Sequence, residues 1–298
     1  MNRIATIGFF DGVHLGHRFL LSQVIQMAEE RKGVSVAVTF SNSPRCVVDR
    51  SFKPSFLTTA QEKRQLLLDC GINEVCMKTF TQETMQLTAR EFMQKVLHDE
   101  LEITMLVIGY DHRFGHNRSD GFDDYVQYGR QMGIEVIKAE AYRENQVPVS
   151  SSIIRQAISE GNIKLANNLL GRPYSIEGLV IDGFHVGRTI GYPTANLDLP
   201  ADKLVPADGV YAVVADIDGR QYTGMLNIGC RPTFDNGRRS IEVHFLDFNE
   251  DIYSQQINLR FIERIRNEKK FDSIDGLTAQ IHDDEKVIRS IINNSQYT

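Results

Sequence analysis

A short stretch near the start of the chain decides the fold class of its first half. Residues 4–17 read IATIGFFDGVHLGH: an apolar run, Ile4–Ile7, then a glycine-rich turn and the start of a helical pattern. Similar apolar runs, typical of buried parallel strands, recur at Val34–Phe40, Glu74–Lys78, Met105–Ile108 and Glu135–Lys138. Amphipathic segments lie between these runs, and the alternation predicts a parallel, doubly wound α/β sheet.

Four amphipathic segments are predicted to be the helices of this sheet, at Leu20–Glu30, Ala60–Asp69, Ala89–Leu101 and Phe122–Met132. A glycine stands between a helical pattern and the next strand at Gly33, Gly71 and Gly133. Glycine adopts the left-handed conformation that commonly ends a helix, so all three are expected to be C-cap residues. Ligands of such sheets bind at the carboxyl ends of the strands, where Gly8–His17 and Gly109–Gly115 fall.

The pattern changes after residue 172, where short β-rich runs replace the alternation. The runs are Ile176–Ile181, Gly209–Ile217, Gln221–Ile228, Ser240–Phe245 and Gln256–Ile265. Asp218-Gly219 between two of them is a strong hairpin signal. No helical crossover separates these runs, which predicts an antiparallel barrel, and a helical stretch, Asp272–Ile292, closes the chain. We place the boundary near Gly171-Arg172-Pro173, which gives domains of residues 1–171 and 172–298.

Composition limits the class of function. The chain has 298 residues, of which 42% are apolar and 24% charged, as in an ordinary globular protein of about two domains. No apolar run is long enough for a membrane span and no secretory signal is recognisable, so a cytoplasmic location is expected. The net charge of −6 argues against a nucleic-acid partner. The cysteines form no C-x-x-C pair, so inert thiols are expected at Cys46, Cys70, Cys76 and Cys230.

The segment from Gly8 to His17 is the most informative motif. His14 and His17 are three residues apart and share a face of a helix that starts there. The N–H groups of a helix N-terminus favour an anion, and two imidazoles add donors for a polyphosphate. A metal or a substrate carboxylate fits less well, because no third ligand lies nearby in sequence. The plainer alternative is that both histidines only pack or cap, but the position after a first strand, as in nucleotidylyltransferases, favours phosphate binding.

A second element supports this prediction. Residues 149–155 read VSSSIIR, which places hydroxyl groups just before a helix and a cation in its first turns. Taken alone, the pattern is more simply an N-cap serine with a surface arginine. Together with the histidine pair, Ser151, Ser152 and Arg155 are better explained as a phosphate clamp.

The second half has its own glycine-rich segment. Residues 183–191 read GFHVGRTIG, and we expect a loop in which Gly183, Gly187 and Arg188 contact phosphates. The segment is not a P-loop, because it lacks the lysine and one spacer residue of that motif.

A candidate metal site and a candidate base follow this segment. Thr194 and Asn196, in Pro-Thr-Ala-Asn, offer a hydroxyl and an amide oxygen on one side of an extended chain. Oxygen ligands of this kind suit Mg²⁺, which keeps waters and shares phosphate oxygens. Glu242 is a carboxylate in an otherwise apolar strand. An outward-facing charge on an alternating strand explains Glu242 equally well from the pattern alone.

Taken together, these motifs resemble the bifunctional prokaryotic riboflavin kinase/FAD synthetase family. The resemblance covers nearly the whole chain in the family's order, at residues 8–17, 108–115, 149–155, 169–174, 191–196, 209–211, 227–234 and 242–253. The sequence departs from the family pattern at Ser41–Ser43, at His112 in place of an aromatic residue, at Ser152 in place of threonine, and at His185-Val186. The resemblance implies a Rossmann-like nucleotidylyltransferase sheet followed by a riboflavin-kinase β-barrel with a terminal helix.

The resemblance also implies two reactions on small-molecule substrates. Riboflavin and ATP give FMN and ADP in the second domain, and FMN and ATP give FAD and pyrophosphate in the first. It assigns the base to Glu242 and Mg²⁺ to Thr194 and Asn196. His14 and His17 are expected to stabilise the triphosphate, with Ser151, Ser152 and Arg155 on the leaving pyrophosphate. We further expect nucleotide contacts from residues of the two glycine-containing motifs, Gly8, Phe10, Asp11, Gly16 and Asp111.

Two other functions remain open on sequence alone. A pantetheine-phosphate or nicotinamide-mononucleotide adenylyltransferase would share the H-x-G-H motif but would leave the barrel and Pro-Thr-Ala-Asn unexplained. A flavin-binding carrier with two inactive sites would not need the intact set His14, His17, Asn196 and Glu242. No nucleic-acid or membrane partner is expected.

Overall fold

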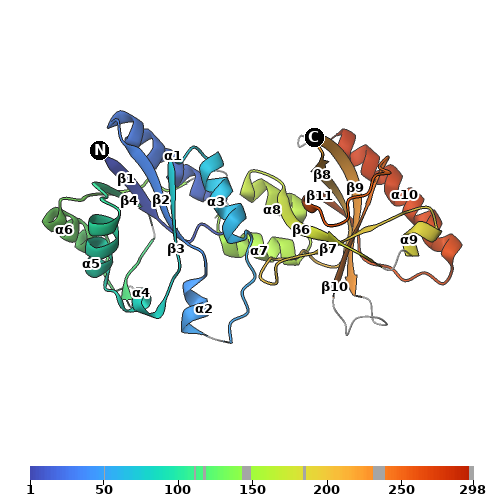
Figure 1. Cartoon of the computed structure of the whole chain (residues 1–298), viewed down its shortest axis with the longest axis horizontal. Helices are drawn as coiled ribbons and strands as arrows, with labels where there is room; N and C mark the ends of the chain where they lie inside the picture. The colour runs from blue at the N-terminus through green and yellow to red at the C-terminus, as the bar shows by residue number, and fades with distance from the viewer. Residues whose placement is uncertain are drawn as a thin grey trace. The chain divides into compact units, whose positions relative to one another are not determined.

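The computed structural model describes residues 1–49, 51–110, 112–116, 119–142, 149–183, 186–230 and 239–294 (Figure 1). The chain forms two compact units, Met1–Ser151 and Ser152–Thr298. The units divide ahead of the predicted boundary at residue 171. The reason is that α8 (Ile163–Leu170), which follows α7 (Ser151–Ser159), packs against two strands of the second unit, β6 (Tyr174–Ile181) and β11 (Gln256–Arg266).

The first unit is built on a five-stranded parallel sheet, as predicted. Its strands are β1 (Arg3–Ile7), β2 (Val34–Phe40), β3 (Glu74–Lys78), β4 (Met105–Ile108) and β5 (Glu135–Lys138). They lie in the order β3-β2-β1-β4-β5, and every neighbouring pair is parallel. The order reverses between β1 and β4, so the loops that follow these two strands flank the switch point where ligands of doubly wound sheets bind.

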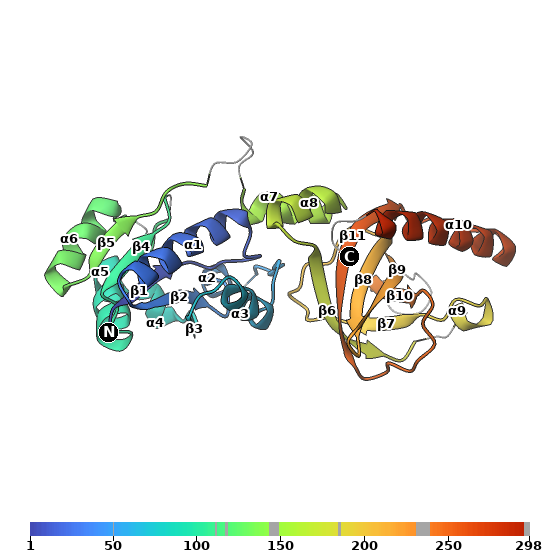
Figure 2. The same ribbon diagram turned by 90° about the horizontal axis from the view of Figure 1, so that it is seen from above.

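Helices cover both faces of this sheet (Figure 2). The helices of this unit are α1 (Leu15–Glu30), α2 (Pro44–Val48), α3 (Ala60–Asp69), α4 (Gln82–Gln86), α5 (Ala89–Phe92), the π-helix η1 (Met93–Glu100) and α6 (Phe122–Met132), of which the short α2 and α4 bury no residue. Successive strand residues point to opposite faces. Ile4 accordingly packs with Leu21 of α1 and Leu67 of α3, whereas Ala5 packs with Met93 of η1 and Tyr125 of α6. The predicted helix at 89–101 is thus α5 continued by η1.

The second unit is a closed barrel with strand order β10-β7-β6-β11-β8-β9, which confirms the predicted antiparallel barrel. The remaining strands are β7 (Ala195–Asp198), β8 (Gly209–Ile217), β9 (Arg220–Cys230) and β10 (Arg239–Phe245). The terminal helix α10 (Ile274–Asn293) lies along the outside of the barrel (Figure 2). Ile288 of α10 packs there against Val210, Ala212 and Val214 of β8. A single helical turn, α9 (Val186–Thr189), lies inside the segment expected to be a loop.

Local conformations confirm most of the turn predictions. Asp218 and Gly219 both have positive φ, 49° and 77°, and join β8 to β9 as a tight hairpin. Gly71 and Gly133 adopt positive φ after α3 and α6. The C-cap prediction for Gly33 is wrong: α1 ends at Glu30 with Arg31 as its C-cap residue, and Lys32 takes the positive φ instead.

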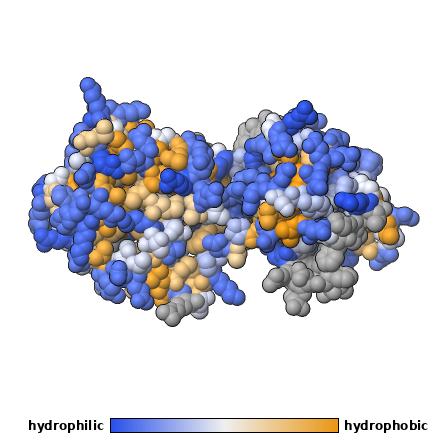
Figure 3. All heavy atoms as spheres, viewed as in Figure 1, coloured by the Kyte–Doolittle hydropathy of each residue, from blue (hydrophilic) through white to orange (hydrophobic). Residues whose placement is uncertain are grey.

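The surface and the thiols agree with the composition. On the face shown in Figure 3, hydrophilic residues cover most of each unit and apolar residues form scattered patches between them. None of the described helices is long and apolar enough to cross a membrane. Cys46 and Cys76 are free thiols, and the described residues contain no group of three or more His, Cys, Asp or Glu suited to a metal ion.

Candidate active sites

The loop after β1 holds an unusual backbone conformation. Phe10, Gly12 and Val13 all have positive φ, 53°, 82° and 39°. Glycine tolerates this region freely, but a β-branched residue such as Val13 rarely adopts it, at a cost of about 1–3 kcal/mol. Strain of this kind persists only where the surroundings fix it, and it is typical of functional loops.

A buried carboxylate fixes this loop. Asp11 is 3% exposed, and its Oδ1 accepts hydrogen bonds from the backbone N–H groups of Leu57 (2.9 Å) and Thr58 (3.2 Å). The N–H of Gly12 in turn donates to Thr58 Oγ1 (3.1 Å). Asp11 therefore ties the loop to the turn before α3. The predicted nucleotide contact of Asp11 stays a prediction, and Asp111 lies outside the described residues.

His14 and His17 form a stacked pair at the start of α1. Their ring centroids are 3.6 Å apart with an interplanar angle of 17°. His14 is the N-cap residue of α1, and its Nδ1 accepts a hydrogen bond from the N–H of His17 (3.3 Å). Because Nδ1 accepts, the proton of a neutral His14 sits on Nε2. The shared face predicted from the three-residue spacing is confirmed, and one of the two histidines also caps, as the plainer alternative held.

Electrostatics keep His17 neutral. Burial lowers the pKa of His17 well below its usual value, and the nearby charges of His14, His112 and Lys63 lower it further. A neutral imidazole still carries one N–H group. The pair can thus donate hydrogen bonds to phosphate oxygens without the cost of a buried positive charge.

The predicted glycines and Phe10 surround these two rings. Phe10 is buried and meets the His17 ring edge-on at 5.2 Å. A Cβ on Gly8 would come within 2.8 Å of the Phe10 ring, and a Cβ on Gly16 within 3.3 Å of the His14 ring. These glycines leave room for the aromatic and imidazole rings that shape the loop.

The serine element reaches the same loop. Ser151 Oγ donates to the backbone carbonyl of Asp11 (2.8 Å), which brings the start of α7 to the loop after β1. One turn into α7, Arg155 Nη2 donates to Ser152 Oγ (3.2 Å). The predicted pyrophosphate contacts of these three residues stay predictions.

Lys63 is a residue that the sequence analysis missed. It is 2% exposed, and its Nζ donates to the carbonyls of Phe9 (3.0 Å) and Phe40 (2.6 Å). Nζ also lies 4.0 Å from the centre of the Phe9 ring. Burial lowers the pKa of Lys63 to about 8, and the charge of Asp11 opposes this shift. The available signal was a lysine four residues before Leu67 on the buried stripe of α3.

The segment Ser41–Ser43, which departs from the family pattern, is hydrogen-bonded to the chain that follows the neighbouring strand. Asn42 Nδ2 donates to the carbonyl of Phe80 (2.9 Å), and the N–H of Phe80 donates to Asn42 Oδ1 (2.8 Å). This double hydrogen bond holds the chain after β2 to the chain after β3. The other departure in this unit, His112, follows β4, and its N–H donates to the carbonyl of Gly109 (3.0 Å).

In the second unit, Glu242 sits at the centre of a polar row across three strands. It pairs directly with Asn196 of β7 on one side and with Asn227 of β9 on the other. Directly paired residues project side chains from the same face of a sheet. Met225, two residues before Asn227, packs with Ile288 of α10, so this face is the outer face of the barrel. Glu242 is only 9% exposed. Asn227 is a second candidate residue that the sequence analysis did not single out.

The glycine segment folds directly onto the Pro-Thr-Ala-Asn motif. A Cβ on Gly183 would overlap the side-chain amide of Asn196. A Cβ on Gly187 would overlap the carbonyl of Tyr192 and would lie 3.4 Å from Thr194 Cγ2. Glycine is thus required at both positions for this close approach. His185 lies outside the described residues, and the side chain of Val186 is not described.

His244 anchors the same motif from β10. Its Nδ1 lies 2.7 Å from the carbonyl oxygen of Pro193, and its ring meets the Tyr192 ring edge-on at 5.2 Å. Because a carbonyl can only accept, Nδ1 must carry the proton. Pro193 precedes Thr194, so this bond helps to place the Thr194 hydroxyl.

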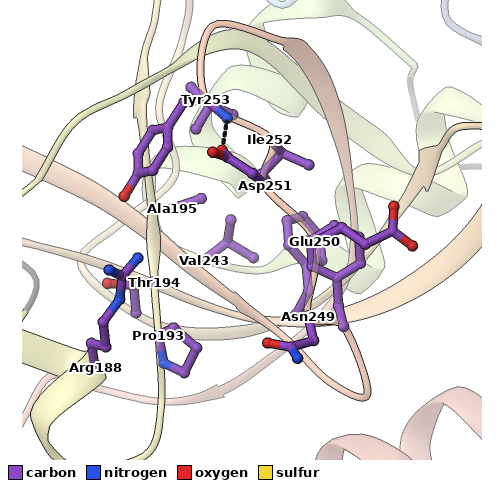
Figure 4. Close-up of a pocket in the computed structure, with 13 residues that line it drawn as sticks. Arg188, Pro193, Thr194, Ala195, Val243, Asn249, Glu250, Asp251, Ile252 and Tyr253 are labelled. Carbon is purple, nitrogen blue, oxygen red and sulfur yellow. Dashed lines mark hydrogen bonds between the residues drawn. The ribbon is translucent and has the colours of Figure 1, made fainter.

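A cavity of about 410 Å³ opens beside this motif (Figure 4). Arg188 and Thr194 lie together on one side of it, Asn249 and Glu250 lie on the opposite side, and Phe248, Asp251, Ile252 and Tyr253 also line it. The Glu250 carboxylate points away from Arg188, whereas the hydroxyl of Tyr253 points toward it. Val243 and Ala195, which are the sequence neighbours of Glu242 and Asn196, also line the cavity.

Comparisons with known proteins assign both units. An FAD synthetase family model matches residues 1–153 and a riboflavin kinase family model matches residues 170–292. A curated bifunctional riboflavin kinase/FMN adenylyltransferase of Escherichia coli K12 is 37% identical over 96% of this chain and 91% of its own length. The chain belongs to this family. The homologous enzyme of Bacillus subtilis is also 37% identical, over 95% of this chain and 90% of its own length.

A solved structure from Streptococcus pneumoniae shows the same fold as this chain. It is 34% identical, has a TM-score of 0.89 and covers 97% of this chain and 94% of that one. Its title calls that protein a macrolide-efflux protein. The assignment here rests on the two family models and the curated enzymes.

Membership in this family fixes the two activities, riboflavin kinase and FMN adenylyltransferase, with ATP, riboflavin and FMN as small-molecule substrates. Enzymes of both kinds typically use a divalent metal. The residue types of the kinase unit fit such an ion, because Asn196 pairs directly with Glu242, Thr194 two residues earlier lines the cavity, and Gly183 leaves space for the Asn196 amide, so the three offer hard oxygen donors.

Proposed function

We propose that the kinase step takes place between Glu242 and the cavity beside Thr194. The terminal hydroxyl of the ribityl chain is a weak nucleophile at neutral pH. The Glu242 carboxylate takes its proton as the oxygen attacks the γ-phosphorus of ATP, and ADP leaves. A positioned general base typically contributes about 10²–10⁴-fold to such a rate. The direct pairing of Glu242 with Asn196 is the observation that carries this proposal.

ATP occupies the cavity in this proposal. Its volume of about 410 Å³ is within the range of small-molecule sites. Arg188 lies beside Thr194, where its guanidinium suits phosphate oxygens (Figure 4). Val243 and Ala195 line the cavity and alternate with Glu242 and Asn196 along their strands, so the base and the Asn196 amide project from the other face of the sheet. Thr194, just before β7, is the lining residue that the proposal shares between the cavity and the metal.

Mg²⁺ is the proposed metal of the kinase site, held by the Thr194 hydroxyl and the Asn196 amide oxygen. When bound, it neutralises charge on the phosphate oxygens. Mg²⁺ keeps several waters and needs few protein ligands, which agrees with a site of one hydroxyl, one amide and a nearby carboxylate.

The adenylylation step needs a different arrangement, because the phosphate of FMN is already an anion. This anion attacks the α-phosphorus of ATP and pyrophosphate leaves, with no proton to remove. Alignment and charge stabilisation are sufficient. We assign the triphosphate to the Nε2–H of His14, to the neutral His17 and to the N-terminus of α1. Ser151, Ser152 and Arg155 are assigned to the leaving pyrophosphate.

A time course tests both assignments. Flavins are separated by chromatography after the protein is mixed with riboflavin, ATP and Mg²⁺. FMN should rise and then give way to FAD. Glu242→Gln should abolish the product from riboflavin but still convert supplied FMN to FAD, and His14→Ala/His17→Ala should stop at FMN. Glu177→Gln is a matched control, because Glu177 on β6 also faces an asparagine, Asn258 of β11, away from the site.

The outcomes separate the alternatives. Riboflavin that stays bound and unconverted would support the inactive carrier. FMN that accumulates without FAD would show that the altered segment at Ser41–Ser43 and His112 has cost the first unit its activity. The functional boundary at residue 171 and the cytoplasmic location stay predictions.

A further inference from the structure

The loop from Leu246 to Ser254 forms one wall of the cavity and is fastened at both ends. At its far end, the N–H of Ser254 donates to the carbonyl of Val180 (3.0 Å), and the N–H of Val180 donates to the carbonyl of Gln255 (2.9 Å). At its near end, the chain leaves β10 through Asp247, whose φ is 56°. Within this loop, the residues that line the cavity begin with the next one, Phe248.

An arginine of the terminal helix holds this near end. Arg289 of α10 donates from Nη1 to Asp247 Oδ2 (2.7 Å) and from Nη2 to Asp247 Oδ1 (2.9 Å). Its Nε donates to Glu285 Oε1 (2.9 Å), one turn earlier on α10. The guanidinium is therefore held by a residue of its own helix and donates hydrogen bonds to both carboxylate oxygens of Asp247. The pKa of Asp247 is lowered, first by its hydrogen bond with Arg289.

This ion pair is not part of the packing that folds the unit. The Arg289 side chain is 43% exposed and that of Asp247 is 73% exposed. Leu246, the preceding residue, packs on Ile288 in the core and supplies the apolar contact between loop and helix. An exposed pair adds little to global stability. Its two-point geometry does, however, set the direction in which the loop leaves the helix.

We propose that Arg289 is a positioning residue for ATP in the kinase reaction, acting through Asp247 on the loop that forms the cavity wall. This inference rests on the proposed function, in which the cavity holds ATP. A loop that is held in one conformation before the nucleotide binds loses less conformational entropy when the nucleotide binds. The pair should therefore affect the KM for ATP and leave kcat and the KM for riboflavin unchanged.

The test measures riboflavin phosphorylation in the full-length enzyme at saturating Mg²⁺. Arg289→Gln should raise the KM for ATP about two- to five-fold, the range of an exposed pair, with kcat unchanged. Asp247→Asn should do the same, since asparagine tolerates the left-handed conformation of this position. The double variant should be no worse than either single one, because both remove one interaction. Arg289→Lys, which keeps the charge without the fork, should be intermediate.

Two controls make the result decisive. Lys286→Gln breaks another exposed ion pair of α10, with Asp283 (3.0 Å), that does not involve the loop, and it should change nothing. Adenylylation of supplied FMN should be unaffected in every variant.

Arg188→Gln, in the cavity itself, tests the underlying assignment. If it raises the KM for ATP and Arg289→Gln does not, the positioning role is wrong and the ATP site stands. If neither changes that KM, the cavity is not the ATP site. Additive effects of Arg289→Gln and Asp247→Asn would also overturn the positioning role.

Discussion

Glu242 and Asn196 face each other directly across two antiparallel strands, β10 and β7, although they are far apart in the sequence. Gly183 lies against the Asn196 amide because no Cβ occupies that space. A proposed base, a proposed metal ligand and a glycine from a third segment thus form one local arrangement on the outer face of the barrel. Four predictions follow from this arrangement and from features of the first unit.

Gly183→Ala should impair the kinase through Asn196. The new Cβ overlaps the Asn196 amide and displaces it, so more Mg²⁺ should be needed for half-maximal rate. Loss of a group that orients a metal ligand typically costs about 10–100-fold in metal affinity. The measurement is the rate of FMN formation against Mg²⁺ concentration at fixed ATP. Gly109→Ala is the control, since a Cβ there meets its neighbours at an ordinary 3.6 Å. An unchanged Mg²⁺ requirement in Gly183→Ala would count against Asn196 as a ligand.

His17 should make the protein less stable in mild acid. Its pKa in the folded state lies well below its usual value, chiefly because of burial, so below pH 6.5 the unfolded chain takes up a proton that the folded chain does not. The free energy of unfolding should fall with pH there, by at most about 1.4 kcal/mol per pH unit. Urea unfolding followed by circular dichroism at pH 7.5, 6 and 5 measures the slope. His17→Gln should lose part of it, and exposed His98→Gln should retain it.

Lys63 should make the free energy of unfolding rise with pH in the alkaline range. Its pKa is about 8 in the folded protein and about 10.5 in the unfolded chain, so between these values the unfolded chain binds more protons and stability rises with pH. The full effect is about 3 kcal/mol. Unfolding of wild type and Lys63→Met is compared at pH 7.5, 9 and 10. The difference between the two curves should grow in favour of wild type as pH rises, and a constant difference would contradict the assignment.

Gly33→Ala should destabilise the first unit although Gly33 is not a helix cap. A Cβ there would lie 2.5 Å from the backbone carbonyl oxygen of Asn2, which accepts a hydrogen bond from Val34 at the start of β2. Relief requires a backbone shift between β1 and β2, at a cost of about 1–3 kcal/mol. Thermal unfolding of Gly33→Ala is compared with that of Gly109→Ala. Equal melting temperatures would show that the close approach at Asn2 is not needed.

Patterns confined to one segment predicted the elements well. The strands β2 to β5 begin and end at the predicted residues, and the Asp218-Gly219 hairpin forms as expected. These features depend on the spacing of apolar residues and on the φ that a residue tolerates, which are local properties. Gly33 shows where that reasoning fails, because the need for glycine there comes from the close approach of Asn2, the residue before β1.

Some features of the candidate sites could also be predicted from local sequence, and others could not. The shared face of His14 and His17 follows from their three-residue spacing, so the sequence predicted it, whereas the stacking of their rings is a finding of the structure. From the sequence, Glu242 could be either a catalytic base or an outward-facing surface charge. Only the register of the barrel strands places Asn196 and Asn227 beside it. The sequence around Lys63 gave no signal beyond its position on the buried stripe of α3. Its hydrogen-bond partners are the carbonyls of Phe9, after β1, and Phe40, at the end of β2, which are distant in the chain.

By itself, the sequence determined the two architectures and the order of their elements, and it indicated candidate residues for binding phosphate, metal and a proton. It did so because side-chain periodicity and backbone preference act over a few residues. Only the tertiary structure decided which side chains meet: Asn196 with Glu242, and two contacts that no sequence motif indicated, Lys63 with Phe9 and Phe40 and Arg289 with Asp247. Such contacts join segments distant in the chain, and strand register and helix packing alone bring them within the few ångströms over which hydrogen bonds act.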